Sequence, residues 1–442
     1  MDGSGSSSAQ AVCPSVHDGG RPGPRTPYGA QMAPSRQRRR LLLALFATAV
    51  STQSPSPLLL RYADVLDLGA LTLTLFFAAY AVGLVPSLLL AGPLSDRDGR
   101  RRVVVGGVVA ALVCTLVLIA ADVGGVPLLV VGRVAQGLAS GAVFTVGTVW
   151  LRELSASEDD EGPGRVRRAA AVASAAMATG FAAGPLVAGL LVQWGPAPQL
   201  VALVPSAVLL LVAVLALRGV PETVLERRPG RLALGVPRVA RRAFWAYLVP
   251  VGLTVYTYAV LSLTVFPLLV AGAGFGAVFA LVGVSALLVQ GSAALVTPLA
   301  TRLGPVVAGP LAALLAAVGC ALGYLAVQPG GWPWVLPACL LIGLGEGLGM
   351  TSGVAVCDRV APADRRGALL SAFYLPVYAG FVVPTVLALA SGDALRGGVP
   401  ILVLAGVGLV LMAVTAGPGR AALRAAGATH ATTVVPVVAP GR

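Results

Sequence analysis

The chain has 442 residues, of which 57% are hydrophobic and only 11% charged, and its formal net charge is +13. A water-soluble domain carries about 25% charged residues, so this composition excludes an ordinary soluble protein and predicts a chain that crosses a membrane many times. In that setting the basic excess is typical of loops that face the lipid bilayer surface, and nucleic acid is not an expected partner.

The first segment, residues 1–40, is rich in Ser, Gly, Pro and Arg and is predicted to form a disordered basic tail. Arginines between positions 36 and 40 directly precede an apolar run, which favours a cytoplasmic amino terminus. Together with Ala47-Thr48-Ala49, the same pattern is also typical of a signal peptide and its cleavage site. Cleavage would remove the first apolar run and leave an odd number of spans.

Twelve apolar runs follow, each of about 20 residues, and each predicts a membrane-spanning helix. The predicted spans are 41–61, 70–94, 101–121, 127–150, 169–191, 199–217, 244–270, 275–299, 306–327, 334–356, 368–390 and 398–416. A Ser-Pro-Ser-Pro run at 54–57 interrupts the first span. Such a break is tolerated where it lines a cavity or lies near the membrane surface.

The distribution of arginine predicts the orientation. With the amino terminus inside, only Arg61 and Arg396 fall in outer loops and Arg133 lies within a span, so the other 28 of 31 arginines are cytoplasmic. Both termini are therefore expected in the cytoplasm. A long polar stretch then divides the chain into an N-terminal six-helix bundle at 41–217, a cytoplasmic linker at 218–243, a C-terminal six-helix bundle at 244–416 and a disordered tail at 417–442.

An internal repeat supports two halves. The Pro-Leu, Arg and Gly of the segment 93–99 recur in the same order 205 positions later, ending at Arg302 and Gly304. Glu153, at the end of the fourth span, corresponds at this offset to Asp358, at the end of the tenth. Two copies of one unit, packed about an axis normal to the membrane, fit this pattern.

The most charged short segment of the first half is G-P-L-S-D-R-D-G-R-R-R at 92–102. It resembles the G-x-L-x-D-R-x-G-R-R loop between the second and third helices of major facilitator superfamily transporters. This resemblance implies an all-α membrane protein with twelve transmembrane helices in two pseudo-symmetric six-helix bundles. It also implies a cytoplasmic gating loop made of Gly92, Asp96, Arg97, Gly99, Arg100 and Arg101 with Glu153.

In the family, the acid of this loop lies against a helix amino terminus of the other half, where the helix dipole favours an anion. Here that helix would start near Gly367. This contact latches the two halves together on the cytoplasmic side in the family. In the second copy of the motif Thr301 replaces Asp96, so here we expect the latch to form from the first copy only. The plainer alternative is a loop that only fixes orientation in the membrane.

The fourth span contains Arg133 and Gln136 in an R-x-x-Q-G pattern that resembles a second family signature, linked there to proton transfer. A charged residue inside the bilayer costs at least about 2.5 kcal/mol, so it is expected to face the bundle interior or water. The alternative is an arginine that extends toward the outer membrane surface.

The fifth span contains Gly180, Gly184, Pro185 and Gly189, which resemble the G-x-x-x-G-P-x-x-G-G signature of proton-driven exporters. Ala188 stands where the family prefers glycine, so the match is incomplete. The alternative is packing of small residues between helices without a transport role.

Glu346 is the only acid well inside a predicted span. Desolvation disfavours the charged form of a carboxylate, which makes Glu346 a candidate for proton coupling together with Arg133. Its glycine-rich surroundings could admit water or substrate, and the alternative is a structural hydrogen bond or an ion pair with Arg133. Polar and aromatic residues that could line a cavity are Gln53, Gln136, Tyr256, Tyr258, Gln290, Tyr374 and Tyr378.

The resemblance implies a bacterial, drug:proton antiporter-like exporter of a small, partly apolar molecule, acting as a monomer in the plasma membrane with protons as its second partner. The alternatives are a proton symporter or uniporter that imports a nutrient, and a receptor or scaffold on a transporter fold, which would have a buried, salt-bridged Arg133 and Glu346. The sequence contains no nucleotide-binding, metal-ligand or nucleophile motif, so we expect neither an enzyme nor a metal or cofactor site.

Overall fold

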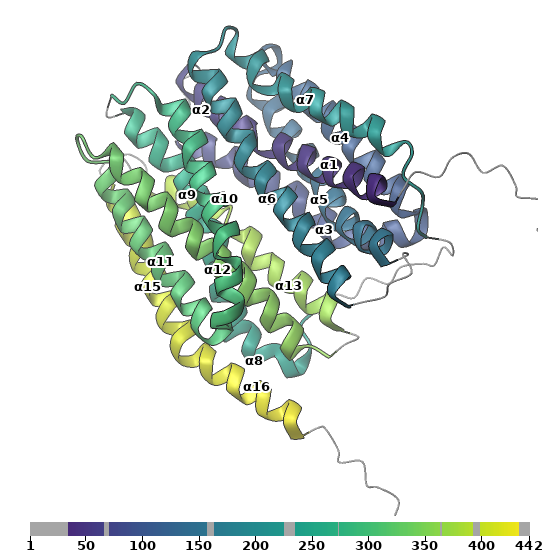
Figure 1. The fold of residues 1–442 in the computed structure, drawn as a ribbon. Helices are drawn as coiled ribbons and strands as arrows, with labels where there is room; N and C mark the ends of the chain where they lie inside the picture. Colours follow the sequence, from purple (N-terminus) through teal and green to yellow (C-terminus); the bar gives the residue numbers. More distant parts are fainter. Residues whose placement is uncertain are drawn as a thin grey trace, which may run out of the picture.

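The computed structural model describes residues 34–65, 70–156, 163–224, 235–272, 274–362, 365–391 and 398–432. All regular elements in these ranges are helical. Figure 1 shows the first half of the chain, in purple to teal, beside the second half, in green to yellow.

The described part of the first half contains seven helices. They are α1 Pro34–Gln53, α2 Pro55–Val65, α3 Ala70–Asp98, α4 Arg100–Ile119, α5 Ala121–Ala156, α6 Pro163–Trp194 and α7 Pro198–Leu217. In the second half, α-helices are joined to short turns of 3-10 and π helix. These elements are η1 Arg238–Ala240, α8 Arg241–Ala243, η2 Phe244–Leu248, α9 Val249–Gly272, α10 Val278–Leu303, α11 Pro305–Ala326, η3 Trp332–Trp334, α12 Val335–Val360, α13 Arg366–Ala379, α14 Val383–Ser391, α15 Val399–Val414, η6 Thr415–Gly419 and α16 Arg420–Thr432.

Within the described residues, eleven helices are long and apolar enough to cross a membrane. The twelfth membrane element is the pair α1 and α2, which corresponds to the first predicted span and breaks at Ser54. Pro55 has no N–H group, so it cannot bond to the carbonyl of Ser51 and the helix cannot continue unchanged. The prediction of a twelve-helix, all-α membrane protein in two bundles is confirmed.

Two segments that we expected to be irregular are helical in part. In the tail predicted at 417–442, α15 continues through η6 into α16 as far as Thr432, and the remaining residues lie outside the described part. In the tail predicted at 1–40, α1 already begins at Pro34. Apolar length was the criterion for a span, and it overlooks polar, alanine-rich segments such as α16, although alanine has the highest helix propensity.

The two halves repeat the same turn. Gly99 joins α3 to α4 with φ 98° and ψ 149°, and Gly304 joins α10 to α11 with φ 69° and ψ 166°. Residues other than glycine rarely adopt such positive φ values. The matching conformations agree with the internal repeat in the sequence.

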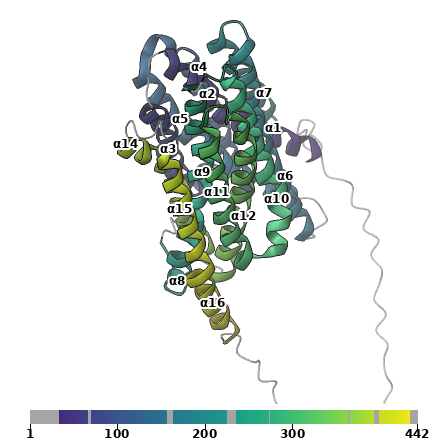
Figure 2. The ribbon, with the colours of Figure 1, turned by 90° about the vertical axis from the view of Figure 1, so that its left-hand side faces the viewer.

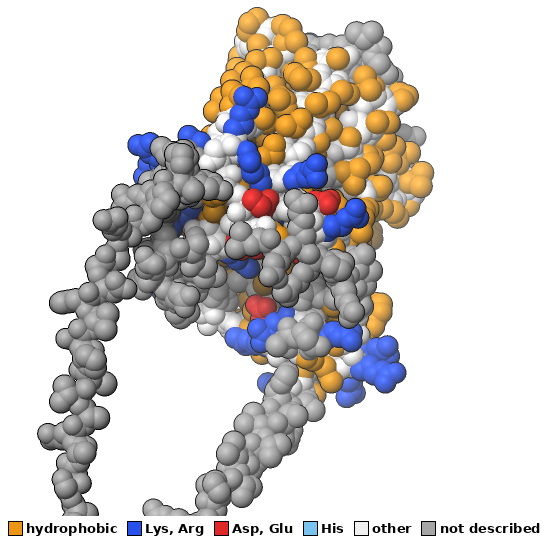
Figure 3. Space-filling model, turned by 90° about the vertical axis from the view of Figure 1, so that its right-hand side faces the viewer, with side chains coloured by type: hydrophobic (Ala, Val, Ile, Leu, Met, Phe, Trp, Pro, Cys, Tyr) orange, Lys and Arg blue, Asp and Glu red, His pale blue; other side chains and the backbone are white. Residues whose placement is uncertain are grey.

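Arginine side chains gather at one end of the bundle, which we call the arginine-rich end; it carries the 92–102 loop, the start of α1, residues 218–224 and α16. Figure 2 shows α8 and α16 at this end. Figure 3 shows the blue arginines grouped on one face, beside a broad surface of hydrophobic side chains. Exposed apolar side chains over such an area are what a lipid-facing surface requires.

One hydrophobic cluster joins the halves at the opposite end. This cluster, here called the shared cluster, packs Phe76 and Val192 of the first half with Val278 and Phe381 of the second. At the arginine-rich end, by contrast, one cluster consists of first-half residues and another of second-half residues. The structure is therefore a conformation in which the halves are packed together at the end opposite the arginines.

Candidate functional site

Arg133 of α5 lies in the interior of the first half, with only 1% of its surface exposed. Its guanidinium donates to the carbonyl oxygen of Thr52 at 2.8 Å and to Oε1 of Gln136 at 2.7 Å. The rings of Tyr80 and Phe77 lie 4.9 and 5.7 Å from it, within the range of cation–π attraction. Because it is buried, the side chain does not extend to the membrane surface. All these partners are uncharged, and within the described residues Arg133 forms no ion pair.

The break between α1 and α2 supplies part of this environment. Pro55 leaves the carbonyl oxygen of Ser51 without its usual helical donor, and Nε2 of Gln136 donates to that oxygen at 2.7 Å. Gln136 also binds Arg133, three positions earlier on the same helical face. The predicted pair Arg133 and Gln136 therefore ties α5 to the broken first membrane element.

Close packing of α3 against α5 brings Tyr80 to Arg133. A Cβ atom on Gly137 would overlap the backbone of α3, and one on Gly141 would lie 2.8 Å from Cβ of Ser87. The hydroxyl groups of Tyr80 and Ser140 lie 3.0 Å apart. Tyr80 was not among the residues predicted from sequence.

Glu346 of α12 is buried, with 7% of its surface exposed. Nε2 of Gln290 donates to its Oε1 at 3.2 Å, while Oε2 has no hydrogen-bond partner among the described residues. A buried carboxylate with one unsatisfied oxygen requires an explanation, because such groups are normally paired. The structural alternative of an ion pair between Glu346 and Arg133 is not what the structure shows, since each binds other groups.

From the sequence, the glycines around Glu346 could have opened space for water or substrate. In the structure they do not. A Cβ atom on Gly345 would lie 2.7 Å from the carbonyl oxygen of Ala312, and one on Gly347 would lie 2.8 Å from Cα of Ala293. These glycines instead allow α12 to pack closely against α10 and α11.

An aromatic group connects the two charged residues across the interface between the halves. Tyr256 is close enough to Glu346 for an electrostatic interaction, and its ring lies 4.9 Å from that of Phe381. Phe381 in turn lies 6.2 Å from Tyr80, which covers Arg133. The rings of Tyr378 and Tyr256 lie 5.4 Å apart, and those of Tyr378 and Tyr374 lie 5.9 Å apart. We call Tyr80, Tyr256, Tyr374, Tyr378 and Phe381 the aromatic group.

Three of the predicted cavity residues, Tyr256, Tyr374 and Tyr378, thus lie together. Tyr258 does not: it is 1% exposed and donates to the carbonyl oxygen of Leu404 in α15 at 2.9 Å. Residues two apart on a helix point in nearly opposite directions, so Tyr256 and Tyr258 cannot face the same space. Gln53 lies at the break between α1 and α2, where its Oε1 accepts a hydrogen bond from Ser56.

The 92–102 loop forms a charge network inside the first half. Arg100 pairs with Asp96 at 2.6 Å and with Glu153 at 3.1 Å. Arg97, on the exposed side, lies 3.5 Å from Asp98. The predicted contact of Asp96 with the helix start near Gly367 is not formed among the described residues, because Arg100 is its partner and a Cβ atom on Gly367 would meet nothing within 4 Å.

Glu222, which we did not predict, caps the start of α4 in this network. Its carboxylate accepts the N–H groups of Arg100 and Arg101 at 2.9 and 3.0 Å, at the beginning of α4. Thr223 donates to Glu153, and Trp150 donates to the carbonyl oxygen of Pro221 at 3.2 Å. The beginning of the segment expected to be a linker is therefore attached to the first half. The sequence signal that could have identified Glu222 is an acidic residue in an arginine-rich segment.

The exporter-like motif on α6 packs against two helices at once. A Cβ atom on Gly180 would lie 2.7 Å from Ala49 of α1, and one on Gly184 would overlap Val50. A Cβ atom on Gly189 would likewise overlap the carbonyl oxygen of Phe279 of α10. In the reverse direction, a Cβ atom on Gly283 of α10 would lie 2.8 Å from the carbonyl oxygen of Pro185. This motif therefore forms a close crossing between the halves, through α6 and α10.

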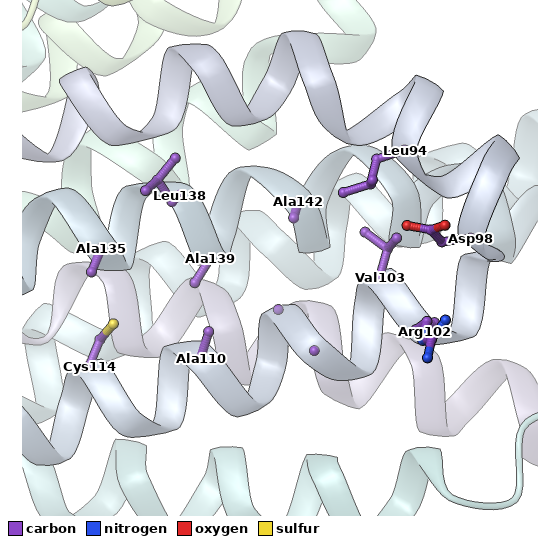
Figure 4. A pocket seen from close by; sticks show the side chains of 12 residues that line it. Leu94, Asp98, Arg102, Val103, Ala110, Cys114, Ala135, Leu138, Ala139 and Ala142 are labelled. Carbon is purple, nitrogen blue, oxygen red and sulfur yellow. The ribbon is translucent and has the colours of Figure 1, made fainter. Parts of the chain in front are cut away.

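A separate, open groove of about 500 Å³ lies on the surface of the first half, between α3, α4 and α5 (Figure 4). Small side chains such as Ala110 and Ala139 line it, and Asp98 and Arg102 lie at one end. It includes none of the aromatic group, nor Arg133 or Glu346. It is therefore distinct from the candidate site between the halves.

Two six-helix halves that meet at a buried polar and aromatic centre are the arrangement of secondary transporters built from repeats. Residues 41–385 match the Major Facilitator Superfamily, which is most of the chain. The chain belongs to this superfamily of transporters.

Two curated proteins resemble parts of the chain. The tetracenomycin C resistance and export protein of Streptomyces glaucescens is 32% identical over 153 residues, which cover 35% of this chain and 26% of that protein. The multidrug resistance protein MdtL of Klebsiella pneumoniae is 36% identical over 89 residues, covering 20% of this chain and 22% of that protein. The matches thus span about a quarter of these relatives.

Among solved structures, the fold resembles a POT family transporter in complex with 5-aminolevulinic acid. The TM-score is 0.70 at 13% identity, over 86% of this chain and 95% of that one. At this identity the likeness supports the fold alone.

Proposed function

We propose that the protein exports a small, partly apolar molecule by alternating access, in exchange for protons. The arginine-rich end and both termini face the cytoplasm in this proposal, and the protein acts as a monomer in the plasma membrane. The observation that carries the proposal is the unsatisfied Oε2 of Glu346, buried beside an aromatic group that contains residues of both halves.

The chemistry of this centre suits exchange. A buried carboxylate is costly when charged and unpaired, so it favours either a proton or a ligand group that donates to Oε2. Aromatic rings at centroid distances of 4.9 to 6.2 Å offer apolar surfaces for a partly apolar molecule. Competition between proton and substrate for Glu346 would couple their movements in opposite directions.

Arg133 has a supporting role in this proposal. Its charge is held by carbonyl oxygens and rings, at the point where the first membrane element breaks. A movement of α1 against α5 would change these contacts and with them the position of Tyr80, which lies next to Phe381 of the second half. Export is favoured over import by the exporter-like motif and by the names of the two curated relatives.

The receptor or scaffold alternative required both charged residues to be buried in salt bridges. Arg133 and Glu346 are buried, but Arg133 binds neutral groups and Glu346 keeps an unsatisfied oxygen. This difference favours transport over a purely structural centre.

Accumulation of ethidium, as the first of a panel of aromatic dyes, in inverted membrane vesicles with an acidic lumen tests the proposal. The native protein is expected to accumulate dye, and Glu346→Gln is expected to abolish the dependence on the proton gradient. Asp358→Asn, which changes an exposed acid on the same helix, serves as the control and retains that dependence. Unchanged gradient-driven uptake by Glu346→Gln would remove Glu346 from the mechanism, and dye loss on acidifying the lumen would indicate a symporter.

A further inference from the structure

The first turn of α10 lacks a cap from its own chain segment. The first N–H groups of a helix have no partner within it and are usually satisfied by Ser, Thr, Asn or Asp at the preceding residue. Here that residue is Ala277, which provides no side-chain hydrogen bond.

Gln193 of the other half supplies the missing cap. Its Oε1 accepts the N–H of Phe279 at 3.1 Å and that of Ala280 at 3.5 Å, the two positions that a capping side chain normally satisfies. Its Nε2 donates to the carbonyl oxygen of Gly276 at 2.9 Å. One amide side chain on α6 therefore completes the start of α10 across the interface.

The cap formed by Gln193 lies beside the shared cluster. Gln193 follows Val192 on α6, and Phe279 follows Val278 on α10, and both valines belong to the shared cluster. The cap thus lies at the end where the halves are packed together. Separation of the halves there would break all three hydrogen bonds at once and leave the first turn of α10 to water.

We propose that Gln193 is a gating residue, whose amide holds the transporter closed at the end opposite the arginines and releases when that end opens. This role rests on the alternating access proposed above. The hydrogen bonds contribute little to either half on its own, because they join only residues of different halves. Their loss should therefore shift the balance between conformations more than it changes the fold.

Cysteine accessibility in membranes tests this role without any transport substrate. In a variant without the native cysteines, Val192→Cys places a thiol at the closed end, where Val192 is 3% exposed. Its labelling rate by a membrane-impermeant maleimide is measured in right-side-out and inverted vesicles. Gln193→Met, which keeps the length of the side chain but not its hydrogen bonds, is expected to raise the rate roughly tenfold. This is the lower end of the effect of losing three hydrogen bonds, because Gln193 is only partly buried.

Gln193→Glu keeps the acceptor for the two N–H groups and adds a negative charge at a helix start, but it loses the donation to Gly276 and places a carboxylate oxygen near that carbonyl. Its labelling rate is therefore expected to lie between those of the native protein and Gln193→Met. The matched control is Gln328→Leu, because Gln328 lies at the same end and, among the described residues, donates within its own half, to Tyr324 at 3.4 Å. If Gln193→Met does not insert, Gln193→Ser is a second variant too short to reach α10.

Equal labelling of the Gln193 and Gln328 variants would overturn the proposal. So would Gln193→Glu labelling as fast as Gln193→Met. The outcome is independent of dye uptake: a shift in labelling without proton-driven transport would refute only the proposed function. Uptake with unchanged labelling would refute only the role of Gln193.

Discussion

Glu222 offers the most direct test of how the segment after α7 is held. Its carboxylate receives two backbone N–H groups of α4 at 2.9 and 3.0 Å and lies where a Cβ atom of residue 99 would be. Hydrogen bonds to a charged group contribute about 1.5–3 kcal/mol when protected, and less here because Glu222 is exposed. Loss of a helix cap costs about 0.5–2 kcal/mol, so we expect Glu222→Ala to cost about 1–2 kcal/mol.

The assay is thermal unfolding of the purified protein in detergent. For a unit of about 200 residues this loss corresponds to a fall of about 2–8 °C in the melting temperature. Glu222→Gln, which keeps one acceptor oxygen and loses the charge, is expected to lose about half as much. In about 1 M salt the Debye length is about 3 Å, so the difference between native and Glu222→Gln should shrink. An unchanged melting temperature in Glu222→Ala at low salt would refute the assignment of Glu222 as the cap of α4.

The other predictions concern the interface between the halves. Gly189→Leu places a side chain against the backbone of Phe279 and is expected to open the closed end, raising labelling at Val192→Cys roughly tenfold, since overpacking costs about 1–3 kcal/mol. Gly291→Leu on α10 is its control, because a Cβ atom there meets nothing within 4 Å, and equal labelling of the two variants would contradict the close crossing. Tyr80→Phe keeps the ring over Arg133 and should leave dye uptake within about twofold of native. Tyr80→Leu loses about 1–2 kcal/mol of cation–π attraction and should slow uptake roughly tenfold. Similar uptake by both Tyr80 variants would show that the ring does not matter.

The fold followed from the apolar runs because a membrane span must be long, apolar and helical whatever its neighbours are. The first span shows the limit of that signal: its prolines predicted a break, but only the structure shows that the freed carbonyl oxygen of Ser51 binds Gln136. The helix α16 lacked such a signal, since it is polar and alanine-rich.

The site was predictable where its residues share one helical face. Arg133 and Gln136 lie three positions apart in one motif, and Tyr374 and Tyr378, both predicted to line a cavity, lie four apart, so each pair shares one face of its helix. Tyr258 lies apart from the other predicted tyrosines because Tyr256, two positions earlier, takes the face toward the interface, and Tyr258 binds the carbonyl oxygen of Leu404 instead. The contacts of Gln193 with α10 and of Glu222 with α4 join segments that are 83 and 122 positions apart in sequence. The packing of the two halves brings the first pair together, and the folding of residues 218–224 onto the first half brings the second.

The central claim is that the halves separate at one end while they join at the other. Spin labels on Arg97 and Arg302, exposed residues at equivalent places of the repeat, allow the distance between the halves at the arginine-rich end to be measured in lipid nanodiscs. The account predicts two populations: a longer distance, as in the present conformation, and a shorter one whose share changes with pH in the native protein but not in Glu346→Gln. A single distance distribution that neither pH nor this substitution alters would contradict it.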